Sequence, residues 1–129
     1  MSTYITIGIE PRTKKNSSRI YGKKLLPSAA YEQYEKDCRV YLRPNPVKSP
    51  INYPVNVKAL YYMQLFKNGN KKNVDISNLH SALHDILVTY GILADDNSTI
   101  VVSTDGSRVI HAKEAGKTEI EITEVEDEP

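Results

Sequence analysis

Alternation of apolar and polar residues is clearest between Val55 and Leu65. Every second residue of this segment is apolar, whereas Asn56, Lys58 and Gln64 lie at intervening positions. Successive side chains of a β-strand point to opposite faces, so the pattern gives one buried side and one polar side. This segment is the clearest predicted strand of the chain.

Shorter alternating or β-branched segments predict the remaining strands. They span Tyr4–Ile9, Arg19–Tyr21, Lys23–Leu26, Thr99–Ser103, Ser107–Ala112 and Thr118–Thr123. Gly22 separates the second and third of them, which predicts a small β-hairpin. Asp105–Arg108 separates two others, and we expect it to form a hairpin tip as well.

Apolar residues at spacings of three and four predict two helices. The first is expected to begin after an N-cap at Ser28 and to end before Pro44. Its apolar face holds Tyr31, Tyr34, Cys38 and Tyr41. The second is expected to begin near Asp75–Ser77 and to stop at Gly91. Its apolar stripe is formed by Leu79, Ala82, Leu83, Ile86 and Tyr90. Strands with two interspersed helices predict an α+β (mixed α/β) domain, with both helices packed on a small, mostly antiparallel or mixed sheet.

Length and composition are those of one globular domain. The chain has 129 residues, of which 40% are hydrophobic, and we expect residues 1–123 to form the domain and residues 124–129 an acidic, flexible tail. Cys38 is the single cysteine, which excludes an internal disulfide and favours a reducing, cytoplasmic compartment. No apolar run reaches the length of a membrane span and no signal-peptide pattern begins the sequence, so we expect no membrane partner.

The net charge of +1 conceals a strong division along the chain. Residues 1–72 contain fourteen Lys or Arg against four Asp or Glu, whereas residues 73–129 contain three against twelve. Six of the basic residues lie between Pro11 and Tyr31, and another group lies between Lys67 and Lys72. Such blocks are typical either of nucleic-acid binding or of solvated loops that keep a protein soluble.

Four carboxylates lie on or beside the second predicted helix: Asp75, Asp85, Asp95 and Asp96. Oxygen ligands of this kind suit Mg²⁺, although single aspartates also serve as N-caps and turn residues. A helix of about fifteen residues is about 22 Å long, so Asp75 and Asp96 do not meet by local geometry alone. Three alternatives remain: the helix begins later, the carboxylates meet across an interface, or Asp85 is the nearer partner of Asp96.

The acidic segment resembles the RusA family of Holliday-junction resolvases. The matching residues are Asp75-Ile-Ser-Asn-Leu-His-Ser-Ala-Leu-His-Asp85, then Tyr90-Gly-Ile-Leu-Ala-Asp-Asp96 and Ile100. The family pattern reads approximately D-x-D-N-L-x-K-x-x-x-D-x-L, followed by a glycine and a pair of aspartates. With Pro11–Ser17 and Leu26–Tyr31, which also look like family segments, the resemblance runs from about Tyr4 to Thr123.

The resemblance implies a single RusA-like nuclease domain that acts as a homodimer on branched, four-way DNA. It implies an endodeoxyribonuclease that makes symmetric paired nicks with Mg²⁺, for which Mn²⁺ can substitute, and with no small-molecule cofactor. It assigns metal binding to Asp75, Asp95 and Asp96 and a catalytic role also to Asp85. We expect DNA contacts from Lys14, Lys15, Asn16, Arg19, Lys23, Lys24, Lys71, Lys72 and Asn78. A bacterial or phage-infected cytoplasm is the expected location.

Two residues depart from the family pattern. Ser77 replaces the second Asp of D-x-D, and Ser81 replaces the helical Lys, so we expect Lys14, Lys15, Lys71 or Lys72 to supply the missing charge. One alternative is therefore a branched-DNA-binding dimer without catalysis, and another is an unrelated α+β domain whose acidic half binds a basic protein. The mechanism requires no histidine base, and we expect His80 and His84 to be surface residues.

Overall fold

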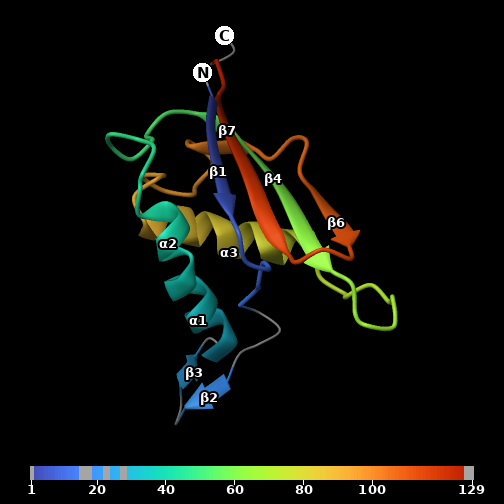
Figure 1. The fold of residues 1–129 in the computed structure, drawn as a ribbon. Coiled ribbons are helices and arrows are strands. Elements are labelled where there is room, and N and C mark those ends of the chain that lie inside the picture. Colours follow the sequence, from blue (N-terminus) through green and yellow to red (C-terminus); the bar gives the residue numbers. More distant parts are fainter. Residues whose placement is uncertain (1, 15–18, 22–23, 27–28, 127–129) are drawn as a thin grey trace.

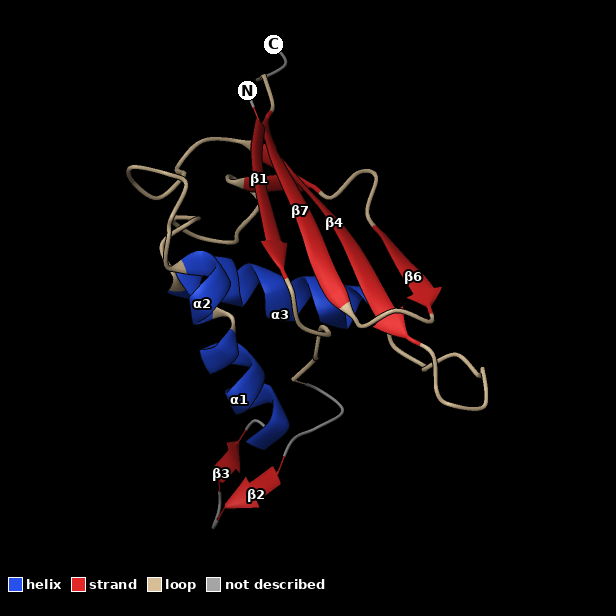
Figure 2. Ribbon diagram, viewed as in Figure 1, coloured by secondary structure: helices blue, strands red, loops and turns tan. Residues whose placement is uncertain are grey.

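A mixed, five-stranded sheet forms one layer of this computed structural model, which describes residues 2–14, 19–21, 24–26 and 29–126 (Figures 1 and 2). The strands of the sheet are β1 (Ser2–Ile7), β4 (Val55–Gln64), β5 (Val101–Ser103), β6 (Arg108–Ala112) and β7 (Lys117–Glu124). The order is β1-β7-β4, with antiparallel pairing, and both β5 and β6 run parallel to β4 along its other edge. The α+β class predicted from the pattern is confirmed.

The core lies between one face of this sheet and the helices. Alternate residues of β4 from Val55 to Met63 are buried, as the sequence pattern predicts. They face α3 (Ile76–Thr89), whose buried stripe consists of Leu79, Ala82, Leu83, Ile86 and Leu87. Tyr90 from the predicted stripe is only partly buried, and its hydroxyl donates to the Glu35 carbonyl at 2.7 Å. The long helix therefore crosses the sheet and is fixed along its whole length.

The first predicted helix is divided into α1 (Ala29–Asp37) and α2 (Arg39–Leu42). Cys38 stands between them with helical backbone angles and is fully buried, so the chain keeps its direction through a slightly irregular turn. Tyr31 and Tyr34 are buried on the predicted face, whereas Tyr41 is partly buried. The small hairpin formed by β2 (Arg19–Tyr21) and β3 (Lys24–Leu26) is confirmed and lies apart from the main sheet (Figure 1).

The predicted hairpin tip at Asp105–Arg108 is wrong. β5 and β6 do not pair with each other, because both lie along the same edge of β4 and are separated by a loop. Asn56 closes this interruption: its Oδ1 accepts hydrogen bonds from the Asp105 amide at 2.7 Å and the Ser103 hydroxyl at 2.6 Å. The alternation of apolar and polar residues predicts two strands here, but it does not show whether they pair with each other in a hairpin or both pair with β4.

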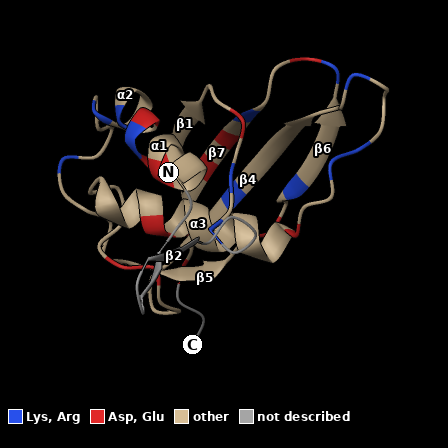
Figure 3. Cartoon of the chain, turned by 90° about the horizontal axis from the view of Figure 1, so that it is seen from below, with Lys and Arg blue, Asp and Glu red and all other residues tan. Residues whose placement is uncertain are grey.

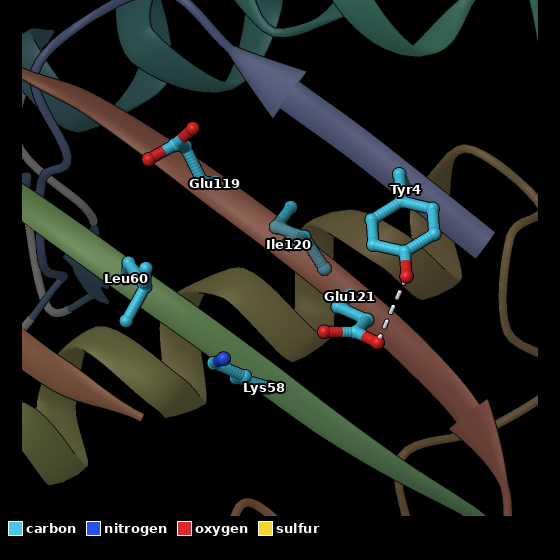
Figure 4. A pocket seen from close by; sticks show the side chains of 6 residues that line it. All are labelled: Tyr4, Lys58, Leu60, Glu119, Ile120 and Glu121. Atoms are coloured by element: carbon cyan, nitrogen blue, oxygen red, sulfur yellow. Dashed lines mark hydrogen bonds between the residues drawn. The ribbon is translucent and has the colours of Figure 1, made fainter. Parts of the chain in front are cut away.

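The other face of the sheet is not covered by helices. Tyr4, Lys58, Leu60, Glu119 and Glu121 project from it and line a shallow hollow of about 170 Å³ (Figure 4). The exposed Tyr4 hydroxyl donates to the Glu121 carboxylate at 3.1 Å, so the face carries its own polar pairings. Among the described residues, no helix is long and apolar enough to cross a membrane.

Candidate active site

The chain after α3 turns back beside the helix that it has just left. Gly91, with a φ of 76°, ends the helix in the left-handed region that glycine tolerates best. Leu93 then forms a parallel bridge with Ile51, and the amide of Ala94 donates to the Ile51 carbonyl at 2.9 Å. Because Ile92 and Leu93 are buried, this anchor fixes the segment that follows. The exposed residues Asp95 and Asp96 are thereby positioned next to the flank of α3.

This return brings the Asp96 carboxyl close to Asp85. Partial desolvation raises the pKa of Asp96 above its ordinary value, and the neighbouring Asp85 carboxylate raises it further. Asp95 acts in the same direction while its Oδ1 accepts the Asp96 amide at 2.7 Å. Two carboxylates this close resist simultaneous ionisation, so they favour either a shared proton or a cation between them.

Lys14 supplies a positive charge to this group. Its Nζ forms an ion pair with the Asp85 carboxylate and lies 5.6 Å from the centroid of the Tyr31 ring. The side chains of Lys14 and Asp85 remain 41% and 38% exposed, so the pair is open to solvent and to a ligand. A residue of the N-terminal basic block therefore meets the acidic segment directly. Acidic positions lie on α3 and on the segments beside it (Figure 3).

Asp75 occupies a different place. It is the N-cap of α3, where its Oδ1 accepts the Ser77 amide at 2.9 Å and the Ser77 hydroxyl at 2.7 Å. It lies ten positions before Asp85, a rise of about 15 Å along the helix. Among the described residues, no three acidic, histidine or cysteine side chains already form a cation site. The sequence left three ways for Asp96 to find a carboxylate partner. A later start of the helix is excluded, because α3 begins at Ile76. The proximity of Asp96 to Asp85 within this chain favours Asp85 as the partner.

The two helical histidines are not the surface residues that we expected. Tyr61 and His80 share a 2.7 Å hydrogen bond through Nδ1, and the rings of His80 and His84 stack with centroids 5.6 Å apart. Burial, together with the neighbouring His80, lowers the pKa of His84 to about 4. Both are therefore neutral residues between α3 and β4, and their spacing on the helix gave no indication of the partner on the sheet.

The residues predicted to bind DNA lie in different structural environments. Lys72 is held by the Glu10 carboxylate at 2.6 Å, Lys71 is exposed, and Asn78 is half-buried in the first turn of α3. Arg19 and Lys24 lie in β2 and β3. Lys15, Asn16 and Lys23 lie outside the described residues. Sequence reasoning missed Glu10, which also accepts the Gln64 amide at 2.9 Å and so ties the N-terminal loop to the end of β4.

The family of the chain agrees with this combination of acidic and basic groups. The family model described as endodeoxyribonuclease RusA matches residues 8–123, which include β4, α3 and the return segment with Asp95 and Asp96. No significant match was found among curated proteins. The chain thus belongs to the RusA family of endodeoxyribonucleases.

Proposed function

We propose that this protein resolves four-way DNA junctions by paired, symmetric hydrolysis of phosphodiester bonds, with a divalent cation held at Asp85 and Asp96. Membership of an endodeoxyribonuclease family supports DNA cleavage as the activity. The observation that carries the site is the approach of Asp96 to Asp85, two carboxylates distant in sequence, beside the ion pair of Asp85 with Lys14. A cation bound between two neighbouring carboxylates would relieve their mutual repulsion, which is why such pairs are candidates for a metal site.

The chemistry of these side chains fits Mg²⁺. This cation takes oxygen ligands and keeps several waters, so one or two carboxylates beside a solvent-open surface are sufficient. When bound, it supplies a water of lowered pKa and polarises the scissile phosphate. We propose that Asp85 and Asp96 hold the cation and that Asp95 orients the Asp96 backbone, a geometry that its 2.7 Å hydrogen bond supports. Mn²⁺ has the same ligand preference and is the expected substitute.

Asp75 remains a proposed ligand from the family resemblance. In the arrangement described above its carboxylate is engaged by Ser77 at the helix N-terminus. In a dimer, Asp75 of one copy would reach the cation held by Asp85 and Asp96 of the other copy. Substitution of each aspartate in turn separates the two assignments.

Lys14 takes the place of the helical lysine that this chain lacks. Ser81 lies one helical turn before Asp85, so a lysine at 81 would contact the same carboxylate. Lys14 makes that contact from the N-terminal loop. We propose that Lys14 neutralises Asp85 before DNA binds and contacts the scissile phosphate afterwards. It thereby stabilises the charge that develops during cleavage.

Symmetric nicking calls for two equivalent sites, and we propose a homodimer formed through the uncovered face of the sheet. This face combines the partly buried Leu60 with charges of both signs, Lys58 on β4 and Glu119 and Glu121 on β7. A face that carries both signs is unsuited to a DNA polyanion but is self-complementary about a two-fold axis. Lys58 of one copy would pair with Glu121 of the other.

The test is incubation of the protein with an end-labelled four-way junction, in Mg²⁺ and in chelator. Nicks at symmetric positions on two opposed strands, abolished by chelator, are the expected result. Binding without nicks would favour the second candidate, a non-catalytic branched-DNA-binding dimer. The specific observation in favour of that candidate is Ser77, which stands where the family pattern has a carboxylate and instead bonds to Asp75. Absence of DNA binding would contradict both.

A further inference from the structure

An exposed aromatic ring follows the end of β4. Phe66 is 53% exposed, and the loop that carries it extends beyond the sheet (Figure 1, yellow-green segment after β4). The loop is a closed turn: the Phe66 amide donates to the Asn70 carbonyl at 3.0 Å, and the Gly69 amide donates to the Phe66 carbonyl at 2.8 Å. Gly69 has a φ of 85°, which the turn requires. The ring is therefore presented by a defined backbone.

Two hollows are lined in part by this residue. One, of about 370 Å³, is lined by Phe66 with Lys67 and Lys113 among its neighbours. The other, of about 400 Å³, is lined by Phe66 with Arg12 and Lys72 among its neighbours. Both are large enough to admit a flat group against the ring, and both contain cationic side chains.

The charge around the ring has one predominant sign. Lys67 and Lys71 are exposed on the same loop, and the Lys72 Nζ lies 5.6 Å from the Phe66 ring centroid. Glu10 binds Lys72 at 2.6 Å and fixes its position beside the ring. An aromatic face within a group of cations is the arrangement by which proteins bind unpaired nucleotides, since bases stack while phosphates meet the lysines. An acidic protein segment would leave the ring without a flat partner.

The second hollow also extends toward the N-terminus of α3, the helix that carries Asp85. Its lining includes Asn73 and Val74, which directly precede the N-cap of α3. Helix α3 therefore connects the two regions: its N-terminus lies toward the Phe66 loop, and its flank carries Asp85 of the candidate active site. A strand bound along this hollow would run from the aromatic ring toward the flank of α3.

We propose that Phe66 stacks on a base that the bound protein unpairs at the branch point of the DNA, and that the loop 65–72 thereby distinguishes branched from continuous duplex. This proposal rests on the proposed function, because it assigns the substrate feature that the nuclease recognises. The ring contacts DNA but does not touch the scissile phosphate. Its removal therefore affects binding selectivity before it affects chemistry.

The test uses a four-way junction with 2-aminopurine placed next to the branch point, in chelator so that no cleavage occurs. Fluorescence reports stacking of the probe base, and anisotropy gives Kd for the junction, for a single strand and for an uninterrupted duplex. The variants are Phe66→Ala and Phe66→Trp. Tyr53→Ala is the matched control, because Tyr53 is 42% exposed and precedes β4 at the opposite end of that strand.

The unaltered protein should change the 2-aminopurine signal, and Phe66→Ala should remove that change. Stacking on one base predicts Kd values for junction and single strand that are about 5- to 100-fold weaker in Phe66→Ala, with the duplex Kd unchanged. Phe66→Trp should restore both readings and Tyr53→Ala should match the unaltered protein.

Several outcomes would overturn the proposal. An unchanged probe signal and junction Kd in Phe66→Ala would exclude stacking while leaving junction cleavage by the unaltered protein intact. An equal loss of affinity for junction and duplex would assign Phe66 to general DNA contact. Binding of an acidic peptide but of no DNA would assign the loop to a protein partner and would also contradict the proposed function.

Discussion

The acidic region beside α3 and the basic loop at the end of β4 are built in different ways. The acidic region assembles from three separated segments, which contribute Lys14, Asp85 and Asp96. The basic loop is continuous in sequence and is closed by its own backbone hydrogen bonds. The first arrangement depends on the whole fold and suits chemistry that needs fixed distances. The second depends on a local turn and suits contact with DNA that varies in shape.

The largest expected effect is the loss of a carboxylate from the assembled region. Asp85→Asn and Asp96→Asn should each reduce the junction-nicking rate at least about 100-fold, because each removes a proposed cation ligand. Asp105→Asn is the matched control, since Asp105 is exposed in the loop between β5 and β6. Single-turnover cleavage of labelled junction measures the effect.

Asp75→Asn sharpens this result. If Asp85 is the nearer ligand, Asp75→Asn should lose less activity than Asp85→Asn while leaving the melting temperature nearly unchanged, because the asparagine side-chain carbonyl still accepts the Ser77 amide as an N-cap. A larger loss of cleavage in Asp75→Asn than in Asp85→Asn would contradict the assignment of Asp85.

A smaller effect is expected from Lys14. Lys14→Ala should reduce cleavage about 10-fold, because Asp85 loses its positive partner. The double variant Lys14→Ala with Ser81→Lys should recover much of the rate, since a lysine at 81 lies one turn from Asp85. Failure of the double variant to exceed Lys14→Ala would show that the loop lysine does not replace a helical one.

A substitution on the uncovered face of the sheet tests whether the proposed dimer forms through that face. Leu60→Glu should weaken self-association at least about 10-fold, because it places a third acidic side chain beside Glu119 and Glu121. Val40→Glu serves as control, since Val40 is 72% exposed on α2, away from that face. Sedimentation equilibrium measures both, and equal association constants would contradict a contact through the sheet.

The smallest effect concerns stability without metal. The raised pKa of Asp96 means that its protonated form is favoured in the folded protein, so this contribution is lost as pH rises through the folded pKa. At neutral pH, Asp96→Asn should therefore melt about 1 °C higher than the unaltered protein, the shift being small because Asp96 is exposed. The difference should vanish at acidic pH and reverse on addition of Mg²⁺. Thermal melting at several pH values checks the sign.

The sequence predicted much of the fold because the elements depend on local patterns. β4 and α3 appeared at nearly their observed bounds, since the period of their buried residues is regular and Asp75 and Gly91 mark the ends of the helix. The predicted hairpin between β5 and β6 was wrong for the same reason, namely that the prediction used only local patterns. Local alternation does not specify which strand a segment pairs with, and Asn56 decides that through tertiary hydrogen bonds.

The candidate site was only partly predictable. The aspartates were identified from their types and spacing, but the approach of Asp96 to Asp85 depends on the bridge between Leu93 and Ile51. Likewise, the sequence placed Lys14 in a basic block without indicating that its partner is Asp85, and it gave no reason to pair His80 with Tyr61. These contacts arise from the return of distant segments to one helix face.

The most direct test of the account is the anomalous scattering of Mn²⁺ in a crystal of the protein grown with that ion. The account predicts a peak within coordinating distance of carboxylate oxygens of both Asp85 and Asp96, with Lys14 displaced from Asp85. A peak bound by Asp75 but not by Asp85, or no peak at the return segment in a crystal whose protein nicks junctions, would contradict it.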